Sequence, residues 1–222
     1  ISEGKMVCSG TTVGLGFGYD GSIVIGRLSL TGLAYLNKIP FYAWNVNTVT
    51  NIAEPSAVNI LTDEFDYPVN IPSGATIVGI ADGRVQSMIK GCDGYVVPDG
   101  TTAGVIGSSY GTRGVKVGDS ARYTFGAPDG SASRWDGMRN IIGGMGMIVE
   151  NGASAVDNNP DVTAADQNPD VVRMRSFAAI TGDGRLMLGT VSSSYRSIAD
   201  SLIAMGITDA MSLDGGGSSM LY

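Results

Sequence analysis

Short glycine-containing turns between apolar runs dominate the hydrophobic pattern of this chain. In three places an apolar run meets Asp-Gly and a second apolar run follows, and Asn-Gly follows the apolar residues 147–149 in the same way. Such dipeptides favour tight β-hairpins, because these turns need positive φ, which glycine adopts at little cost. The pattern therefore predicts hairpins that turn at Asp20-Gly21, Asp82-Gly83, Asn151-Gly152 and Asp183-Gly184.

A strand and a helix stand out beside the hairpins. Residues 121–125 alternate, so that Ala121, Tyr123 and Phe125 share one face of a predicted strand. Residues 194–205 have helical spacing instead, with an apolar face made by Ile198, Leu202 and Met205. Ser197 and Asp200 resemble a capping box, with Ser194 as the alternative N-cap, and Gly206 is expected to end the helix.

These elements predict an α+β fold, a predominantly antiparallel, curved β-sheet with hairpins and one or two packed helices. The second and weaker helix is expected over residues 30–37. Nothing in the 222 residues marks a linker, so we expect a single domain over residues 1–222. Because the chain begins with Ile1, we expect a processed or trimmed chain that is extracytoplasmic or secreted. The oligomeric state is not indicated by any pattern in the sequence.

Composition narrows the possible chemistry. With 14 basic and 21 acidic residues the net charge is −7, which disfavours nucleic acid as a partner. The absence of histidine excludes Ser-His-Asp hydrolysis and histidine-ligated metal sites. Cys8 and Cys92 alone cannot form a structural zinc site. No apolar run reaches the length of a membrane span.

The segment after the last apolar strand carries the strongest signal for chemistry. Asp214 is followed by Gly215, Gly216 and Gly217 and then by Ser218 and Ser219. Consecutive glycines weaken a fold, but they allow a ligand to approach the backbone, and their amides can bind an anion. Asp214 is placed to act as an acid, a base or a ligand anchor. The structural alternative is a bulge in which Asp214 caps its own turn.

Two arginines form a second candidate. Arg173 and Arg175 are two residues apart in a predicted strand, so they point to the same side. Arginine binds phosphate or carboxylate through two parallel hydrogen bonds. The alternative is a solvated strand edge that the two charges protect.

Other motifs have a structural and a functional interpretation. Trp135 could stack on a sugar, although a core position is favoured, and Asn140 could bind substrate hydroxyls or cap a turn. Residues 157–170 form a polar loop whose oxygen side chains could bind structural calcium, but their spacing is not that of an EF-hand and a solvated loop is favoured. These side chains are Asp157, Asn158, Asn159, Asp161 and Asp166.

Two short matches to known motifs are set aside. Residues 16–21 fit G-x-G-x-x-G, but the residues that follow indicate a strand where a dinucleotide site needs a helix. Residues 107–111 fit G-x-S-x-G, but a nucleophile elbow needs a histidine, which the chain lacks.

The C-terminal motif resembles the signature of the phosphodiester glycosidase family. The resemblance rests on residues 213–220, and it is supported in order by residues 116–119, 140–149, 175–184 and 194–210. It covers about residues 74–222. Ser176 stands where the family has threonine, and Gly146 where proline is common. An early strand of the family is missing, so the domain is expected to lack its N-terminal strand segment.

The resemblance implies a hydrolase that cleaves the glycosidic linkage of a sugar 1-phosphodiester, similar to an N-acetylglucosamine 1-phosphodiester. It implies Asp214 and Arg175 as catalytic residues. We expect no metal ligands among the site residues and no cofactor apart from the structural calcium considered above. The implied substrate-binding residues are Ser176, Gly215, Gly216, Gly217, Ser218, Ser219, Asn140, Gly143 and Gly144. The alternatives are a glycosidase for phosphate-free glycans and a non-catalytic module that binds glycans or cell wall.

Overall fold

Antiparallel strands make up most of this protein. The computed structural model describes residues 13–28, 30–43, 45–48, 57–107, 112, 114–126, 134–158 and 168–219. The contacts divide the chain into two compact units. Unit 1 comprises residues 1–10 and 29–133, and unit 2 comprises residues 11–28 and 134–222. The prediction of a single domain over residues 1–222 stays a prediction, because two units can still fold cooperatively.

Unit 1 contains two sheets. The three-stranded sheet has the order β10-β3-β4 and consists of β10 (Ala121–Gly126), β3 (Thr31–Leu36) and β4 (Ile39–Tyr42). The five-stranded sheet has the order β5-β6-β9-β7-β8, and only β5 and β6 pair in parallel. Its strands are β5 (Asn45–Val46), β6 (Val58–Thr62), β9 (Thr102–Ile106), β7 (Val69–Ala81) and β8 (Arg84–Tyr95).

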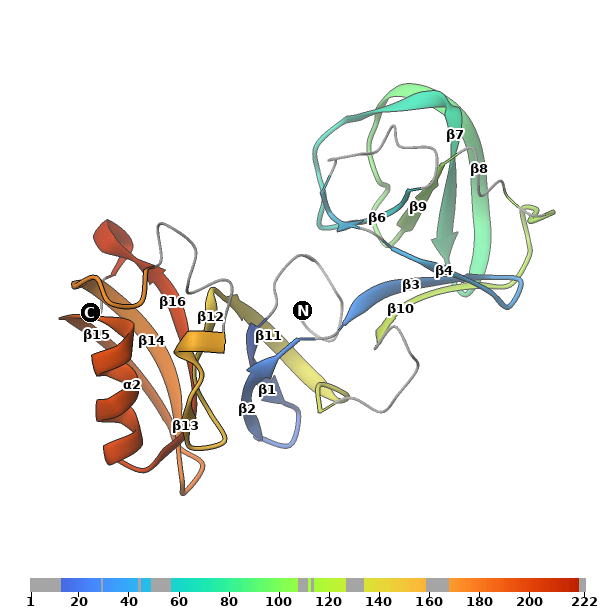
Figure 1. The fold of residues 1–222 in the computed structure, drawn as a ribbon. Coiled ribbons are helices and arrows are strands. Elements are labelled where there is room, and N and C mark those ends of the chain that lie inside the picture. Colours follow the sequence, from blue (N-terminus) through green and yellow to red (C-terminus); the bar gives the residue numbers. More distant parts are fainter. Residues whose placement is uncertain are drawn as a thin grey trace. The chain divides into compact units, whose positions relative to one another are not determined.

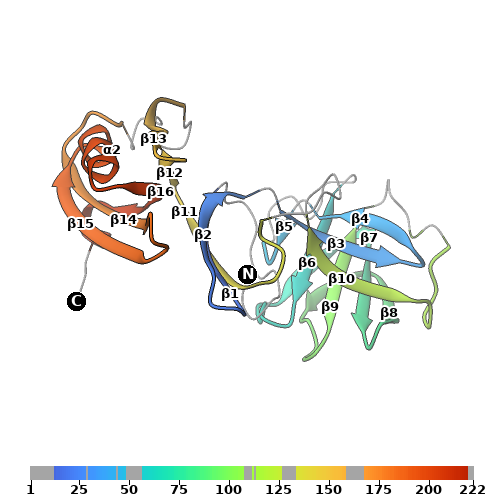
Figure 2. The same ribbon diagram turned by 90° about the horizontal axis from the view of Figure 1, so that it is seen from below.

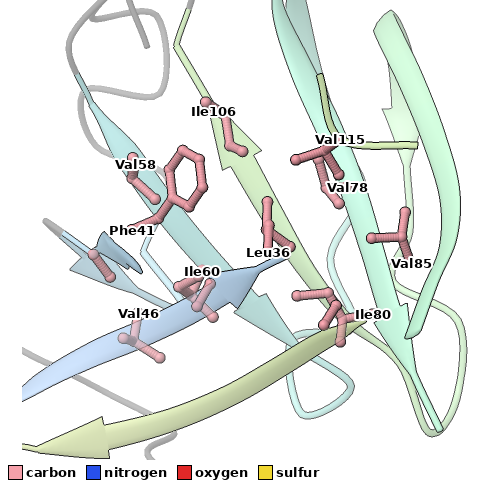
Figure 3. Packing of buried hydrophobic residues seen from close by; sticks show 13 residues of the cluster. Leu36, Phe41, Val46, Val58, Ile60, Val78, Ile80, Val85, Ile106 and Val115 are labelled. Atoms are coloured by element: carbon pink, nitrogen blue, oxygen red, sulfur yellow. The ribbon is translucent and has the colours of Figure 1, made fainter. Parts of the chain in front are cut away.

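The core of unit 1 lies between these two sheets. Figure 3 shows Leu36 and Phe41 of the smaller sheet packed with Ile60, Val78 and Ile106 of the larger one. Along β3 the side chains alternate, so that Ala34 and Leu36 are buried while Tyr35 points to the opposite face.

Unit 2 also contains two sheets. The three-stranded sheet has the order β11-β1-β2, with β11 (Met138–Gly144), β1 (Val13–Gly18) and β2 (Ile23–Arg27). The five-stranded sheet has the order β13-β12-β16-β14-β15. Its strands are β13 (Ala153–Ser154), β12 (Gly146–Glu150), β16 (Ile207–Gly215), β14 (Arg173–Thr181) and β15 (Leu186–Ser193).

The single α-helix among the described residues, α2 (Tyr195–Ala204), covers one face of this five-stranded sheet. The sheet curves around α2, as Figures 1 and 2 show. The pleat of β14 divides its side chains between two cores. Phe177 and Ala179 pack with α2, whereas Ala178 and Ile180 pack with residues of β1 and β2. Two short 3-10 turns, η1 (Val156–Asn158) and η3 (Gly216–Ser218), complete the unit.

The hairpin predictions are confirmed, although two kinds of turn are used. Asp82-Gly83 and Asn151-Gly152 have positive φ at both residues, as a type I′ turn requires. At the other two turns only the glycine, Gly21 or Gly184, has positive φ. In these longer loops the glycine alone occupies the position whose positive φ would strain an L-residue. The aspartate therefore keeps an ordinary backbone conformation.

The helix over residues 194–205 is confirmed, and the helix over residues 30–37 is wrong. The Ser194 side chain accepts a hydrogen bond from the amide of Ser197, and Gly206 has a φ of +79° after the helix. The second segment is β3, paired with β10 on one side and β4 on the other. Gly32 disfavours a helix, and the two neighbouring strands satisfy the backbone of β3 instead.

The antiparallel and curved character of the fold is thus confirmed, but the α+β class fits loosely because strands predominate. Among the described residues no helix has the length and apolar character needed to cross a membrane. Residues 121–125 lie in β10, as predicted.

Candidate active site

The register between β14 and β16 brings the two predicted catalytic motifs together. Arg175 lies opposite Gly215 in the antiparallel ladder, next to Asp214. The ladder is irregular between Arg175 and Phe177, so the end of β16 departs from regular pairing at this point. The Arg175 guanidinium faces the glycine segment, because Nη1 lies 4.0 Å from the position that a Cβ on Gly215 would take.

Arg175 is a buried cation whose described partners are neutral groups of its own unit. The residue is only 2% exposed, and its guanidinium stacks on the Tyr195 ring at 4.1 Å from the centroid. Nη2 donates to the backbone carbonyl of Val171 at 3.2 Å and to that of Asn168 at 3.4 Å. β14 lies between β16 and β15, so the alternative of a solvated charged edge does not apply to Arg175. Arg173, two residues earlier, is exposed.

Arg196, at the start of α2, fixes the segment that contacts Arg175. Its Nε donates to Asp170 at 2.9 Å, and its two terminal nitrogens donate to the two oxygens of Asp157 at 2.9 and 2.8 Å. The Arg196 amide also donates to the carbonyl of Pro169 at 3.3 Å. These hydrogen bonds from Arg196 lower the pKa of the Asp157 carboxyl. The same segment, residues 168–171, therefore touches both arginines.

The glycine segment forms an exposed turn after β16. Asp214 is exposed, and its Oδ1 accepts a hydrogen bond from the Gly215 amide at 2.8 Å, as in the predicted self-capped bulge. Gly216 has a φ of +65°, which favours glycine. A Cβ on Gly216 or Gly217 would meet no atom within 4 Å, so this backbone borders open space. The turn thus leaves Asp214 and two glycines accessible to a ligand.

The predicted serines have different surroundings. Ser219 is 9% exposed, and its hydroxyl donates to the Asp214 carbonyl at 3.5 Å while its amide donates to Gly216. Ser218 lies in η3, but its side chain is outside the described part of the structure. Ser176 follows Arg175 in β14 and therefore points to the other face of the sheet. Its role in substrate binding stays a prediction.

The third predicted group lies on β11. Asn140 and Gly143 pair with Phe17 and Gly14 of β1. The end of β11 reaches β16, because a Cβ on Gly144 would lie 2.9 Å from the carbonyl oxygen of Ser212. Packing thus explains the glycine at position 144, because β11 and β16 approach too closely there for a larger side chain. No contact described for Asn140 links it to the Asp214 turn.

The remaining sequence predictions have mixed outcomes. Trp135 is a core residue, 1% exposed, and its Nε1 donates to the Arg27 carbonyl at 2.9 Å. Residues 16–21 form the β1–β2 hairpin, as predicted. Most of residues 107–111 lies outside the described residues.

The predicted calcium ligands are described only in part. Asp157 pairs with Arg196, and Asn158 lies in η1. Asn159, Asp161 and Asp166 lie outside the described residues. In the described ranges no three acidic or cysteine side chains come together to hold a metal ion. The calcium site stays a prediction.

Sequence patterns identified α2 but not what its first turn does. Tyr195 and Arg196 connect Arg175 with residues 168–170, although the helical periodicity assigned them no role. An aromatic residue next to an arginine directly after an N-cap serine was the available signal. Neither residue type is specific enough at that position to reveal a partner that lies far away in the sequence.

A family model described as phosphodiester glycosidase matches residues 74–222, which is more than half of the chain. The chain therefore belongs to the phosphodiester glycosidase family. The matched region contains Arg175, Asp214 and the glycine segment. A search of curated proteins found no match.

Solved structures share the fold at low sequence identity. A hypothetical protein from Synechocystis superposes with a TM-score of 0.72 at 15% identity, over 98% of this chain and 42% of that one. A protein from Burkholderia pseudomallei, named as a candidate exported protein, gives 0.57 at 14% identity, over 97% of this chain and 53% of that one. The chain thus spans about half, or less, of the length of these two proteins.

The catalytic domain of zebrafish N-acetylglucosamine-1-phosphodiester alpha-N-acetylglucosaminidase, auto-inhibited by its pro-peptide, also aligns. Its identity is 12%, over 98% of this chain and 75% of that one, with a TM-score of 0.35. A TM-score this low carries no argument about a shared arrangement.

Proposed function

We propose that this protein hydrolyses the glycosidic linkage of a sugar 1-phosphodiester similar to an N-acetylglucosamine 1-phosphodiester. The observation that carries the proposal is the register of Arg175 with Gly215, which puts a buried guanidinium directly beside the exposed Asp214 turn. Membership of the phosphodiester glycosidase family supports the reaction class. The substrate is accordingly a carbohydrate joined to phosphate through its anomeric carbon.

In this proposal the bond between the anomeric carbon and the phosphate oxygen breaks. Positive charge develops on the sugar, and the Asp214 carboxylate stabilises it or activates a water molecule. The water oxygen bonds to the anomeric carbon and gives one proton to the Asp214 carboxylate or to solvent, and the phosphate monoester leaves with the electron pair of the broken bond. A phosphate leaves as a stabilised anion, so it needs less help from an acid than a sugar alcohol does.

Arg175 and the amides and hydroxyls of residues 215–219 supply the anion-binding part of the proposal. Fixed donors aimed at developing charge are usually the largest catalytic contribution. In the described conformation Arg175 is covered, so its charge acts on the turn from beneath Gly215. Direct contact with a phosphate oxygen requires the covering residues to move. Its orientation is preset by Tyr195 and the carbonyl of Val171.

The test measures release of the sugar from an N-acetylglucosamine 1-phosphodiester by the wild type and by Asp214→Asn and Arg175→Lys. Loss of a carboxylate that assists proton transfer or stabilises charge should lower kcat by about 100-fold or more. Asp183→Asn and Arg185→Lys are matched controls, because this exposed ion pair lies at the β14–β15 turn. Unchanged turnover in both site variants would overturn the site assignment.

The same assay separates the alternative functions. A neutral methyl glycoside replaces the phosphodiester as substrate in one arm, and equal or faster cleavage of it would favour a glycosidase for phosphate-free glycans. Binding of both compounds without any turnover would favour a non-catalytic module.

We also propose an extracytoplasmic location, since one structural neighbour is named as a candidate exported protein. Recovery of the native protein only in the cytoplasmic fraction would overturn the location.

A further inference from the structure

A pocket on the outer face of unit 1 has cationic walls although the protein as a whole is acidic. Its volume is about 490 Å³, within the range of about 300–1,000 Å³ that is usual for small-molecule sites. It is lined by Tyr35, Lys38, Gly83, Ser120, Ala121 and Arg122. Two of these residues are cations and none is acidic, in a chain whose net charge is −7.

The central feature of the pocket is an arginine held on an aromatic ring. Arg122 and Tyr35 lie directly opposite each other in the β10–β3 ladder, on the face that points away from the unit 1 core. The Arg122 guanidinium lies 4.3 Å from the centroid of the Tyr35 ring. Cross-strand contact and the cation–π attraction keep the guanidinium over the ring. Its planar donors are therefore oriented before any ligand arrives.

Backbone hydrogen bonds fix the rim of the pocket. The Ala121 amide donates to the Gly83 carbonyl at 2.8 Å, which ties the start of β10 to the β7–β8 turn. The Asn37 amide donates to the Ser120 carbonyl at 2.8 Å, which ties the β3–β4 turn to the same point. Lys38 belongs to that turn and has a φ of +69°, so its backbone position is set by the turn. The cations thus project from a rigid frame.

Two acidic groups lie next to this frame: Asp82, which precedes Gly83 but does not line the pocket, and Asp119, which is already engaged. Asp119 Oδ2 accepts hydrogen bonds from the Asn37 side chain at 3.2 Å and from the Lys116 amide at 2.8 Å. It closes the turn over residues 116–119, so its charge faces the turn and not the lining of the pocket. Lys38 and Arg122 are both exposed, and so is Ser120, which adds a hydroxyl. This combination recognises a negative charge carried by a molecule with further polar groups.

We propose that this pocket binds a small organic anion, a sugar or similar polyol that carries a carboxylate or a phosphate. The anionic group pairs with Arg122 and Lys38, the Ser120 hydroxyl bonds to a ligand oxygen, and the organic part lies against Tyr35 and Ala121. An inorganic anion would leave this last surface uncovered. The pocket consists of residues of unit 1, whereas the Asp214 turn consists of residues of unit 2, so this proposal does not depend on the function proposed for that turn.

The test titrates the 222-residue protein with D-glucuronate, D-glucose 1-phosphate, D-glucose and inorganic phosphate and follows the Tyr35 ring signals by NMR. A local signal is needed because the proposed function predicts that a sugar phosphate also binds in unit 2. Glucuronate or glucose 1-phosphate should shift the Tyr35 signals with saturation, and the comparison of the two shows whether carboxylate or phosphate is preferred. Glucose and inorganic phosphate should bind at least tenfold more weakly.

Arg122→Gln and Lys38→Gln should each weaken binding by tenfold or more, and both side chains are exposed, so folding should be preserved. Lys90→Gln is the matched control, since it removes the same charge from an exposed position of unit 1 outside the pocket. It should change affinity less than twofold. Asp214→Asn should leave the Tyr35 response intact even if it abolishes turnover. The proposal would be overturned if neither glucuronate nor glucose 1-phosphate caused saturable shifts of the Tyr35 signals. It would also be overturned if Arg122→Gln bound them as tightly as the wild type does.

Discussion

The conformation of Gly216 shows how one residue shapes the candidate active site. Its φ of +65° lies in the left-handed region, and the space around its Cβ position is open. A side chain at this position would strain the backbone conformation but would not clash with a neighbouring atom. Neighbouring Gly217 has the same open surroundings without a positive φ. This pair allows backbone strain to be separated from the loss of space for a ligand.

We predict that Gly216→Ala is less stable than Gly217→Ala by about 1 kcal/mol, the cost of placing an L-residue in the left-handed region. Denaturant unfolding of both variants measures this difference. If the turn binds substrate through its backbone, Gly216→Ala should also lower kcat/KM more than Gly217→Ala. Equal stability of the two variants would show that the turn relaxes around the new side chain.

Residue patterns predicted the Asp214 motif but not the surroundings of Arg175. The three glycines and the carboxylate are visible in a few consecutive letters, and the exposed turn follows from local backbone preferences. The burial of Arg175 depends on Tyr195, which is twenty residues away in sequence and belongs to another element. An i, i+2 pair of arginines predicted one common environment, whereas Arg173 is exposed and Arg175 is covered.

Among the elements, α2 is connected through Arg196 to both ends of the polar loop, residues 157–170. Asp157 lies in η1, and Asp170 lies just before β14. These ion pairs are exposed, so their contribution to stability is small and sensitive to salt. Their role is chiefly to hold residues 168–171 in place against Arg175. That role has a pH dependence that can be measured.

We predict that Asp157→Asn removes part of the acid sensitivity of the folded state. The hydrogen bonds from Arg196 lower the pKa of Asp157 in the folded protein. The stabilisation that this carboxylate provides is therefore fully present above the pKa of Asp157 in the unfolded chain, which is about 4. It is lost as the pH falls from there through the lower pKa of Asp157 in the folded protein. The difference in stability between wild type and Asp157→Asn should therefore be present at pH 7 and should shrink as the pH falls below about 4. Denaturant midpoints across this range measure it.

The control for this prediction is a double-mutant cycle with Arg196→Gln. Once the guanidinium is absent, Asp157→Asn should cause little further loss at pH 7, because the interaction is already gone. Additive effects of the two substitutions would contradict a direct coupling between Arg196 and Asp157.

The element predictions failed where long-range pairing overrides local preference. Residues 194–205 have a capping serine, an apolar stripe and a terminal glycine, and these local signals all favour the observed helix. Residues 30–37 lack such signals, and their apolar spacing fits a helix as well as a strand. Pairing with β10 and β4 decides between them, and both partners can be placed only with the tertiary structure in hand.

For the molecule as a whole, the larger part of unit 1, residues 29–133, is inserted into unit 2 along the chain. Unit 2 takes β1 and β2 from before residue 29 and every other strand from after residue 133. Both ends of the insertion are anchored within unit 2. Arg134 Nη2 donates to the Ile25 carbonyl at 2.9 Å, and Trp135 Nε1 donates to the Arg27 carbonyl at 2.9 Å. A short connection can therefore join residue 28 to residue 134.

We predict that unit 2 folds after residues 29–133 are replaced by a short Gly/Ser linker. Each unit has its own buried clusters, and insertions between chain ends that lie close together are well tolerated. Trp135 is then the only tryptophan left. Folding is reported by a blue-shifted Trp135 emission maximum that shifts cooperatively to longer wavelength in denaturant. A red-shifted emission maximum without denaturant would show instead that the chain folds only as the single domain expected from its sequence.

Local sequence is enough to establish the four predicted hairpin turns, the capped helix over residues 194–205, the glycine turn after Asp214 and membership of the phosphodiester glycosidase family. These depend on neighbouring residues or on a motif of consecutive letters. The folded structure was needed to show that β3 is a strand, that the chain divides into two units, and that Arg175 lies against Gly215 while Arg122 lies on Tyr35. Those features depend on strand register between segments far apart in the chain, where packing of whole faces decides which residues meet.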